Sequence, residues 1–209
     1  MILTDKRKLL PPLHIPPRLH KDALLMSFKH HWHIKKAYKE IIGLNDVSHF
    51  SINIVNPDGT MSVISYNPSI VYKIFQDGTY LYNGTISPTY YEKLDFYTWD
   101  QCYDKRFYSQ VKLSLQIKNG IDVGVNLIHR AYGFNILFSF ASKTRNSDLF
   151  INVVENNKEF IKMGFHCLEL IKEIYSQYHE SNDMLLIKQP TFIKPFCRPT
   201  FTLIRNQER

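Results

Sequence analysis

The sequence predicts a mixed α/β fold in which helices pack against a sheet made of hairpins. Two pairs of short apolar runs are each joined by turn residues, which is the pattern of antiparallel strands. Between and around these runs lie segments whose apolar residues recur at helical spacing. The chain has 209 residues, of which 44% are hydrophobic, so it is long enough to bury a substantial core.

The N-terminal segment changes character near residue 20. Four prolines fall within residues 1–20, so we expect an extended lead-in without packed structure, because proline fixes φ and lacks a backbone donor. Residues 21–42 then carry apolar side chains at helical spacing, and Gly43 follows as a helix-end signal. Three histidines crowd this helix, but no carboxylate or thiol stands at a matching position. We therefore expect a polar helix surface and no metal site.

Two hairpins are predicted further along the chain. Residues 47–64 alternate in polarity around an Asn-Pro-Asp-Gly sequence at 56–59, and these turn residues are typical of a tight connection between strands. Residues 123–128 and 134–140 form two apolar runs with Gly133 in the turn between them. The runs are short and bounded by turn signals, which indicates buried strands.

The segment from Ser65 to Asp100 combines a helix start with a dense aromatic set. Asn67 can cap a helix that begins at Pro68, and Gly78 supplies its end. The aromatic residues that follow are Tyr80, Tyr82, Tyr90, Tyr91, Phe96, Tyr97 and Trp99. They fit either a closed pocket for a small, partly apolar molecule or an ordinary aromatic core. Composition alone favours the core.

The remaining segments read as helices. Residues 101–118 carry one apolar stripe, and Gly120 marks its end. The region from Ser147 to Tyr178 carries a shorter and then a longer apolar stripe, so we expect a closing helical region there.

The net charge bears on the binding partners of the protein, and the cysteine content bears on the redox compartment in which it resides. The formal net charge is +7, but the basic residues are scattered along the chain. We interpret them as an ordinary solvated surface and expect no membrane partner; nucleic-acid binding through the basic C-terminal end stays an alternative. Cys102, Cys167 and Cys197 are an odd, widely spaced set, which indicates free thiols in a reducing compartment rather than a disulfide framework. With no apolar run of spanning length and no secretory signal, we expect a cytoplasmic protein.

Known enzyme signatures are missing from the sequence. It contains no Gly-rich phosphate loop, no His-Glu-x-x-His motif and no nucleophile elbow. We therefore expect a protein that is not an enzyme and needs no cofactor.

The aromatic segment resembles the autoinducer-binding domain of LuxR-type quorum-sensing regulators. In that family a Tyr-Pro-x-x-Trp-x-x-x-Tyr segment opens a helix, an Asp-Pro follows, and a further Trp comes later. Here Pro68 opens the helix, Phe75 stands at the second aromatic position, Tyr80 fits the next aromatic, and Trp99 falls where the later Trp belongs. Residues 119–124 resemble the family's Gly-x-x-x-Gly step into its fourth strand. Ser139 occupies the place of a serine that faces the ligand, although a local hydrogen bond is an equal alternative for this strand hydroxyl.

The resemblance implies an α/β/α sandwich. Its central antiparallel sheet has about five strands, covered by helices on both sides in a PAS- or GAF-like arrangement. The domain would span residues 21–179, and the final helix would contribute to a dimer. Residues 180–209 would form a tail or linker without the DNA-binding helix-turn-helix of the family, because three prolines interrupt this short segment.

Three departures from the family pattern affect the ligand. Asn67 replaces the first Tyr, with Tyr66 adjacent, Val71 replaces the Trp, and Gly84 replaces the Asp that accepts the amide N–H of an acyl homoserine lactone. A buried donor left without its acceptor is costly, so we expect weak recognition of acyl homoserine lactones. The candidate ligand-binding residues are Tyr66, Asn67, Val71, Phe75, Tyr80, Gly84, Trp99 and Ser139.

The predicted function is the sensing of an acyl homoserine lactone-like or related small-molecule signal, linked to quorum sensing and transcriptional regulation. The alternative is a protein-interaction module of the same fold, with its pocket filled by its own aromatic side chains. Such a module would pair with a full-length regulator or another partner protein. The sensor itself would act as a homodimer or as a heterodimer with a full-length regulator.

Overall fold

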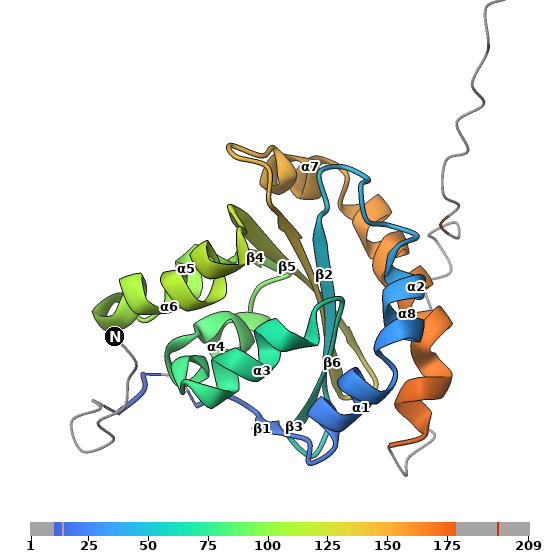
Figure 1. Cartoon of the computed structure of the whole chain (residues 1–209), viewed down its shortest axis with the longest axis horizontal. Coiled ribbons are helices and arrows are strands. Elements are labelled where there is room, and N and C mark those ends of the chain that lie inside the picture. The colour runs from blue at the N-terminus through green and yellow to red at the C-terminus, as the bar shows by residue number, and fades with distance from the viewer. Residues whose placement is uncertain (1–10, 14, 179–195, 197–209) are drawn as a thin grey trace, which may run out of the picture.

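A six-stranded sheet with the strand order β1-β3-β2-β6-β5-β4 forms the centre of the fold (Figure 1). The computed structural model describes residues 11–13, 15–178 and 196. Its elements are β1 (Arg18–Leu19), α1 (Ala23–Lys29), α2 (His31–Tyr38), β2 (His49–Val55), β3 (Thr60–Ser65), α3 (Pro68–Gln76), η1 (Thr79–Tyr82), η2 (Gly84–Ile86), α4 (Pro88–Tyr91), β4 (Phe96–Thr98), α5 (Trp99–Cys102), η3 (Lys105–Phe107), α6 (Tyr108–Leu115), η4 (Ile117–Asn119), β5 (Val123–Ala131), β6 (Phe134–Ser142), α7 (Leu149–Glu155) and α8 (Asn157–Ser176). Within these residues, none of the helices combines the length and the apolar character that crossing a bilayer requires.

Both predicted hairpins form. The β2–β3 pair turns through Asn56 to Gly59, where the Asp58 carboxylate accepts the backbone N–H of Thr60 at 2.8 Å. The β5–β6 pair turns at Tyr132 and Gly133, which both have positive φ. Two central residues with φ > 0 match the right-handed twist of the strands. The hairpins join through the antiparallel β2–β6 pairing, so each lies beside the other in the middle of the sheet.

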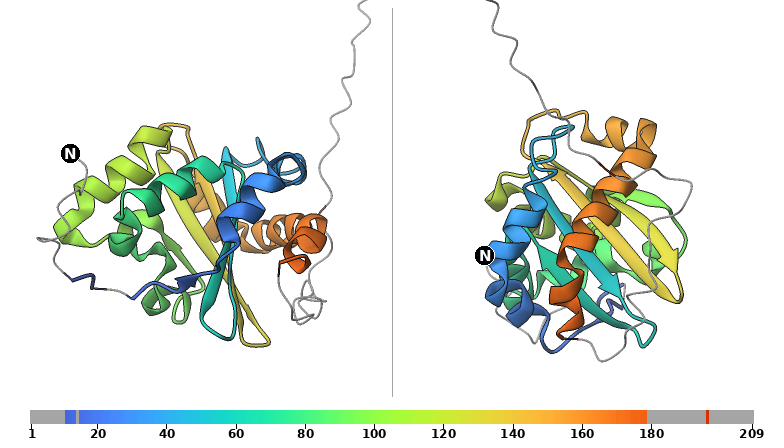
Figure 2. Two further views of the ribbon diagram at one scale, coloured as in Figure 1. Left: turned by 60° about the horizontal axis from the view of Figure 1, so that its bottom comes forward. Right: turned by 90° about the vertical axis from the view of Figure 1, so that its right-hand side faces the viewer.

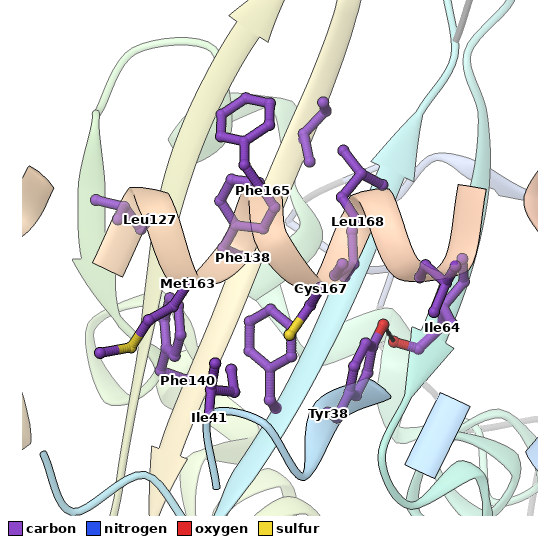
Figure 3. Close-up of a cluster of buried hydrophobic side chains, with 14 of the residues drawn as sticks. Tyr38, Ile41, Ile64, Leu127, Phe138, Phe140, Met163, Phe165, Cys167 and Leu168 are labelled. Atoms are coloured by element: carbon purple, nitrogen blue, oxygen red, sulfur yellow. Dashed lines mark hydrogen bonds between the residues drawn. The ribbon is translucent and has the colours of Figure 1, made fainter. Parts of the chain in front are cut away.

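Helices cover both faces of the sheet, which confirms the predicted α/β sandwich (Figure 1, Figure 2). On one face α8 lies across the strands beside α2, and on the other lie α3, α4, α5 and α6. The α8 helix buries residues at spacings of three and four, including Phe160, Phe165 and Leu168, so one stripe of it faces the sheet. Figure 3 shows this stripe meeting Phe138 and Phe140 of β6 in an apolar core, beside which the Tyr38 hydroxyl donates to the Ile64 carbonyl.

The sheet has six strands rather than about five, and it is not wholly antiparallel. Arg18 and Leu19 pair in parallel with Thr60 and Met61 of β3. The end of the expected lead-in is therefore packed as an edge strand, directly after two prolines that favour extended backbone. Next to it, the Ser27 hydroxyl donates to the Val63 carbonyl at 2.7 Å, so β1 and α1 together cover the edge of β3.

Two expected helices are interrupted. The helix expected at 21–42 breaks at His30, and the break lets α1 pack against β3 while α2 packs against α8. The helix expected at 101–118 is divided because Tyr103 is extended and forms an isolated bridge with Asn83. Asp104 then accepts the Arg106 N–H and starts a new turn. The expected tail at 180–209, including Cys197, lies outside the described residues apart from Phe196.

Candidate ligand pocket

The alternation of β2 creates the floor of a pocket. His49, Ser51 and Asn53 are buried and point to the face that α3 covers, whereas the residues between them join the apolar core under α8. Successive side chains of a strand point to opposite faces, so one strand supplies a polar floor on one side and an apolar wall on the other.

A cavity of about 70 Å³ lies between this floor and the helices α3, α5 and α6. Its lining residues are His49, Ser51, Asn53, Met61, Val63, Ser65, Ile70, Val71, Ile74, Phe75, Tyr80, Asn83, Thr85, Ile86, Trp99, Leu115 and Ser139. Pockets for drug-sized ligands have volumes of roughly 300–1,000 Å³, so a ligand of that size needs side chains at the rim to move.

The apolar wall opposite the floor comes from α3. As predicted, the Asn67 side chain caps the helix by accepting the Ser69 N–H at 3.2 Å, and Pro68 occupies its first turn. The helix then directs Val71 and Phe75 toward the cavity, one turn apart. The Phe75 ring stacks on Tyr80 with centroids 4.6 Å apart. Both rings are partly exposed, so this stacked pair lies at the solvent side of the cavity.

A chain of hydrogen bonds centred on Asn126 fixes the polar end of the pocket. The Trp99 indole N–H donates to Asn126 Oδ1 at 3.0 Å, and the Ser139 hydroxyl donates to the same oxygen. The Asn126 amide in turn donates to the Thr85 carbonyl at 2.9 Å, where the Tyr97 hydroxyl also donates at 2.7 Å. A buried network of this kind orients its members strongly because each unpaired group would be costly. Asn126 therefore holds Trp99 and the η2 turn in place.

The position of the Trp99 ring also depends on Gly124. The indole ring lies so close to this strand residue that a Cβ atom there would come within 2.1 Å of Trp99 Cδ2. Trp99 follows β4 directly, and β4 pairs with β5. A glycine at 124 thus lets the ring lie flat on the sheet. This is the physical role of the second glycine in the 119–124 segment, while Gly120 ends η4 with φ +65°.

Asn53 and Ser51 retain hydrogen-bonding capacity toward the cavity. Within the described part of the chain, the Asn53 side chain makes one hydrogen bond, from Nδ2 to the Ser139 oxygen at 3.4 Å. A side-chain amide has two donors and an acceptor oxygen, so most of its capacity faces the cavity. The Ser51 hydroxyl lies beside it on β2, cross-strand from Ser139. These two groups can therefore bond a polar atom of a bound molecule.

The pocket carries no formal charge at neutral pH. None of its lining residues is Asp, Glu, Lys or Arg. Burial, together with the nearby Lys143 cation, lowers the pKa of His49 to about 4, so this imidazole is neutral above that pH. A charged ligand would lose its hydration without gaining a counter-ion, which is strongly unfavourable. The chemistry of the lining therefore fits an uncharged molecule.

The structure gathers five of the eight candidate residues around the cavity, namely Val71, Phe75, Tyr80, Trp99 and Ser139. Asn67 does not line it and acts as a helix cap. Tyr66 packs against the core on the other side of the sheet, with Lys35 Nζ 5.8 Å from its ring centroid. Gly84 is buried in η2 between two lining residues without lining the cavity itself. Ser139 borders the cavity and is hydrogen-bonded within the protein, so its expected local hydrogen bond is present, and its contact with a ligand stays a prediction.

Several polar residues of the site escaped the sequence-based prediction, among them Ser65, Asn83, Thr85 and four others. The four that shape the polar floor and its network are His49, Ser51, Asn53 and Asn126, all on strands. The available signal was polar residues at every second position of strands whose other positions are apolar, which places them on one shared face. They do not include a metal centre: no group of three or more His, Cys, Asp or Glu side chains able to hold a metal occurs among the described residues. Cys102 and Cys167 are free and buried, and burial raises the pKa of the Cys102 thiol to about 12.

The fold and the pocket define a class: an α/β-sandwich domain with an uncharged cavity between its sheet and a layer of short helices. The structure of Escherichia coli SdiA is similar to this chain, with a TM-score of 0.51, 12% sequence identity, and coverage of 76% of this chain and 70% of SdiA. This similarity confirms the fold that the LuxR-type resemblance implied.

Two further solved structures show weaker similarity. SdiA in complex with octanoyl-rac-glycerol gives a TM-score of 0.47 at 11% identity, covering 74% of this chain and 63% of that one. The N-acylhomoserine lactone dependent LuxR family transcription factor CepR2 from Burkholderia cenocepacia gives 0.42 at 11% identity, covering 75% of this chain and 89% of that one. No protein-family model matches the sequence, and neither does any curated protein.

Proposed function

We propose that this chain is a sensor domain that binds a small, uncharged, amphipathic molecule between its sheet and α3. The observation that carries the proposal is the division of one cavity into two chemistries. Ser51 and Asn53 on the floor offer unused hydrogen-bonding groups, and Val71 and Phe75 opposite them are apolar. Such a pair of surfaces fits an apolar chain with a neutral polar head. The signal would be of the acyl homoserine lactone-like or a related class and would act in quorum sensing and transcriptional regulation.

The head group of the signal would differ from a homoserine lactone in its contacts. The LuxR-type resemblance implies that Gly84 stands where the family carries its carboxylate acceptor, and the charge-free lining supplies no replacement anion. Asn53 would instead bond the head through its amide, which can donate as well as accept. Trp99 and Ser139 would position the site, because their polar hydrogens are already donated to Asn126.

The test is the thermal stability of the purified chain against neutral ligands and a charged control. Acyl homoserine lactones and monoacylglycerols of several chain lengths are compared with fatty acids of the same lengths. A ligand that binds only the folded state raises the free energy of unfolding, by about 2.7 kcal/mol at a ligand concentration of a hundred times Kd. Tm rises as a consequence. We expect a chain-length-dependent rise with one neutral class and none with the carboxylates. An equal response to the fatty acids would contradict the uncharged site.

The second candidate function is the protein-interaction module, and the small cavity volume favours it. At about 70 Å³ the space between the side chains is too small for an acyl chain unless the Phe75–Tyr80 pair opens. A module of this kind would pair with a regulator or another protein, with its pocket filled by its own aromatic side chains. A folded protein, free of co-purified small molecules, whose Tm responds to no ligand would favour this candidate over the sensor.

A further inference from the structure

The outer side of α1 and α2 carries large apolar side chains that the core does not use. Leu25, Phe28 and Trp32 are 57%, 45% and 78% exposed. Leu25 and Phe28 are three positions apart in α1 and so share one side of that helix, and Trp32 follows in α2 beyond the break at His30. The opposite side of these helices supplies the buried residues, namely Ala23, Met26, Ser27, Ile34, Ala37 and Tyr38. Figure 2 shows the two helices at the outside of the molecule beside α8.

One of these apolar side chains contacts a further exposed ring on another helix. The Phe28 ring meets Tyr72 of α3, itself 45% exposed, in an edge-to-face contact with centroids 6.1 Å apart. Single exposed apolar residues are normal on protein surfaces. An exposed apolar contact between two helices, with Leu25 and Trp32 also exposed on the same segment, is instead typical of a surface that meets another apolar phase or partner.

Lysines surround these apolar side chains. The other exposed residues between 21 and 39 are Lys21, Lys29, His33, Lys36 and Lys39, whereas the carboxylates of the segment, Asp22 and Glu40, are half-buried. We call these residues, with Leu25, Phe28 and Trp32, the α1–α2 face. A hollow of about 390 Å³ on it is lined by Trp32, His33, Lys35, Lys36 and Lys39, and Lys35 Nζ lies 5.8 Å from the Trp32 ring centroid. The face therefore combines positive charge with an exposed indole.

We propose that the α1–α2 face binds the surface of a membrane that contains anionic lipids. Lysines on such a face are attracted to anionic headgroups, while Trp, Phe and Leu enter the boundary between headgroups and acyl chains. The long lysine side chains can keep their charge in the headgroup layer while their methylene groups lie against it. This surface is separate from the ligand pocket, so the inference does not depend on the proposed function.

Two other occupants fit the face less well. A second copy would set the lysines of one face against those of the other in a two-fold contact, and like charges repel. Nucleic acid would satisfy the lysines, but its phosphate backbone offers no apolar surface for Leu25 and Phe28. An anionic bilayer satisfies both features of the face at once.

The experiment is flotation of the full chain with vesicles of phosphatidylcholine alone or mixed with phosphatidylserine, at physiological ionic strength. We expect binding to the mixed vesicles only. Each lysine near an anionic surface strengthens binding about fivefold, so the double reversal K29E/K36E should weaken binding by at least about tenfold. The matched control K105E/K118E makes the same change in net charge at exposed lysines of η3 and η4, and it should weaken binding much less.

Tryptophan fluorescence provides a second, local readout. The chain has two tryptophans, of which Trp32 is exposed and Trp99 is 5% exposed. Mixed vesicles should shift the emission of Trp32 to shorter wavelength, and W32F should abolish the shift while the Trp99 emission stays unchanged. W32A should weaken vesicle binding without lowering Tm, since the side chain is solvent-exposed.

Three outcomes would overturn the proposal. They are the absence of binding to mixed vesicles, an equal loss in K29E/K36E and K105E/K118E, and an unchanged Trp32 emission in bound protein. A further outcome against it is that the wild-type chain binds no vesicles and instead binds duplex DNA or dimerises with increasing concentration. If K29E/K36E or W32A then loses that DNA binding or that dimer, the α1–α2 face binds that partner and not a membrane.

Discussion

The two faces of the central sheet are built from the same strands but differ in what holds them. Under α8, alternate residues of β2 and β6 such as Phe50, Phe138 and Phe140 meet a continuous 20-residue helix in an apolar core. Under α3 to α6, the intervening residues, such as Asn53 and Ser139, meet short helices across a cavity and a hydrogen-bond network. The face under α8 is held by one large apolar cluster, whereas the other face combines two smaller apolar clusters with directional bonds around a space.

The difference assigns separate tasks to the two faces. Apolar packing gains free energy from buried area without regard to direction, so the face under α8 can supply most of the stability. Directional bonds fix positions at modest net gain, so the pocket face can hold polar groups at set places around a void. Changes to the first face should therefore alter stability, and changes to the second should alter binding.

The largest expected effect is the loss of stability in Phe138→Ala. Phe138 is fully buried, with its ring 5.3 Å from that of Phe165 and against Gly164 of α8. Replacing such a ring with a methyl group costs about 3–5 kcal/mol through lost transfer energy and the cavity left behind. Urea unfolding measures the change. Phe75→Ala, at the partly exposed pocket rim, should cost clearly less, and equal costs would contradict the separation of tasks.

The next effect is a loss of stability in acid through His49 on the pocket floor. The folded protein holds the pKa of this group near 4, against a usual value of 6.5. Between these values the unfolded chain binds more protons than the folded one, so stability falls as the pH decreases from 6.5 to about 4. The slope is about 1.4 kcal/mol per pH unit for one such group. Urea unfolding across this pH range measures it.

The matched variant for this prediction is His49→Gln, which keeps a polar side chain that does not titrate. Burial also lowers the pKa of His129, which adds to the slope in the same direction in both proteins. The difference between the two pH profiles therefore isolates His49. Parallel profiles between pH 6.5 and 4 would show that the folded protein accepts a charged imidazole at this position.

A smaller effect compares one glycine from each face. A Cβ at Gly164 would come within 2.5 Å of the Phe138 ring, and one at Gly124 within 2.1 Å of the Trp99 ring. Overpacking costs about 1–3 kcal/mol, and replacing glycine by alanine returns part of this through backbone entropy. We expect G164A and G124A to lower stability by similar amounts. Only G124A should disturb the pocket, because it displaces Trp99.

Trp99 fluorescence in a W32F background separates these two variants. With Trp32 replaced, all tryptophan emission comes from Trp99. G124A should change its emission maximum, and G164A should leave it unchanged. A change in both variants would mean that the two faces are mechanically coupled through the sheet, and the comparison between them would then fail.

The local elements of the fold could be predicted from the sequence because their signals are local. The turn at 56–59, the cap at Asn67 and the apolar stripe of α8 each depend on residues a few positions apart. The break at His30 could not be predicted this way, since it depends on α1 and α2 packing against different partners. The two-residue strand β1 likewise depends on the distant edge of β3.

Only the part of the pocket that has a local sequence signal could be predicted. The aromatic residues Phe75, Tyr80 and Trp99 stood out as a dense local group. Asn53 and Asn126 did not, because single amides in strands resemble ordinary solvated positions until the strand pairing brings them to Ser139. The lysines of the α1–α2 face all lie within residues 21–39, and the sequence-based interpretation of the basic residues as scattered overlooked them.

The smallest expected change in stability is that of Asn53→Ala, and it has the sharpest consequence for the pocket face. The Asn53 amide makes one long hydrogen bond, to Ser139 at 3.4 Å, so its loss should cost less than about 1 kcal/mol. Asn126→Ala removes the partner of both Trp99 and Ser139 and leaves buried polar groups unpaired, at about 1–3 kcal/mol. Urea unfolding of both variants measures this difference.

If a ligand raises the Tm of the wild-type protein, Asn53→Ala should reduce that rise although the protein is almost as stable. A cost for Asn53→Ala equal to that for Asn126→Ala would make Asn53 a structural residue like Asn126, and would leave the pocket floor without a free polar group for a ligand.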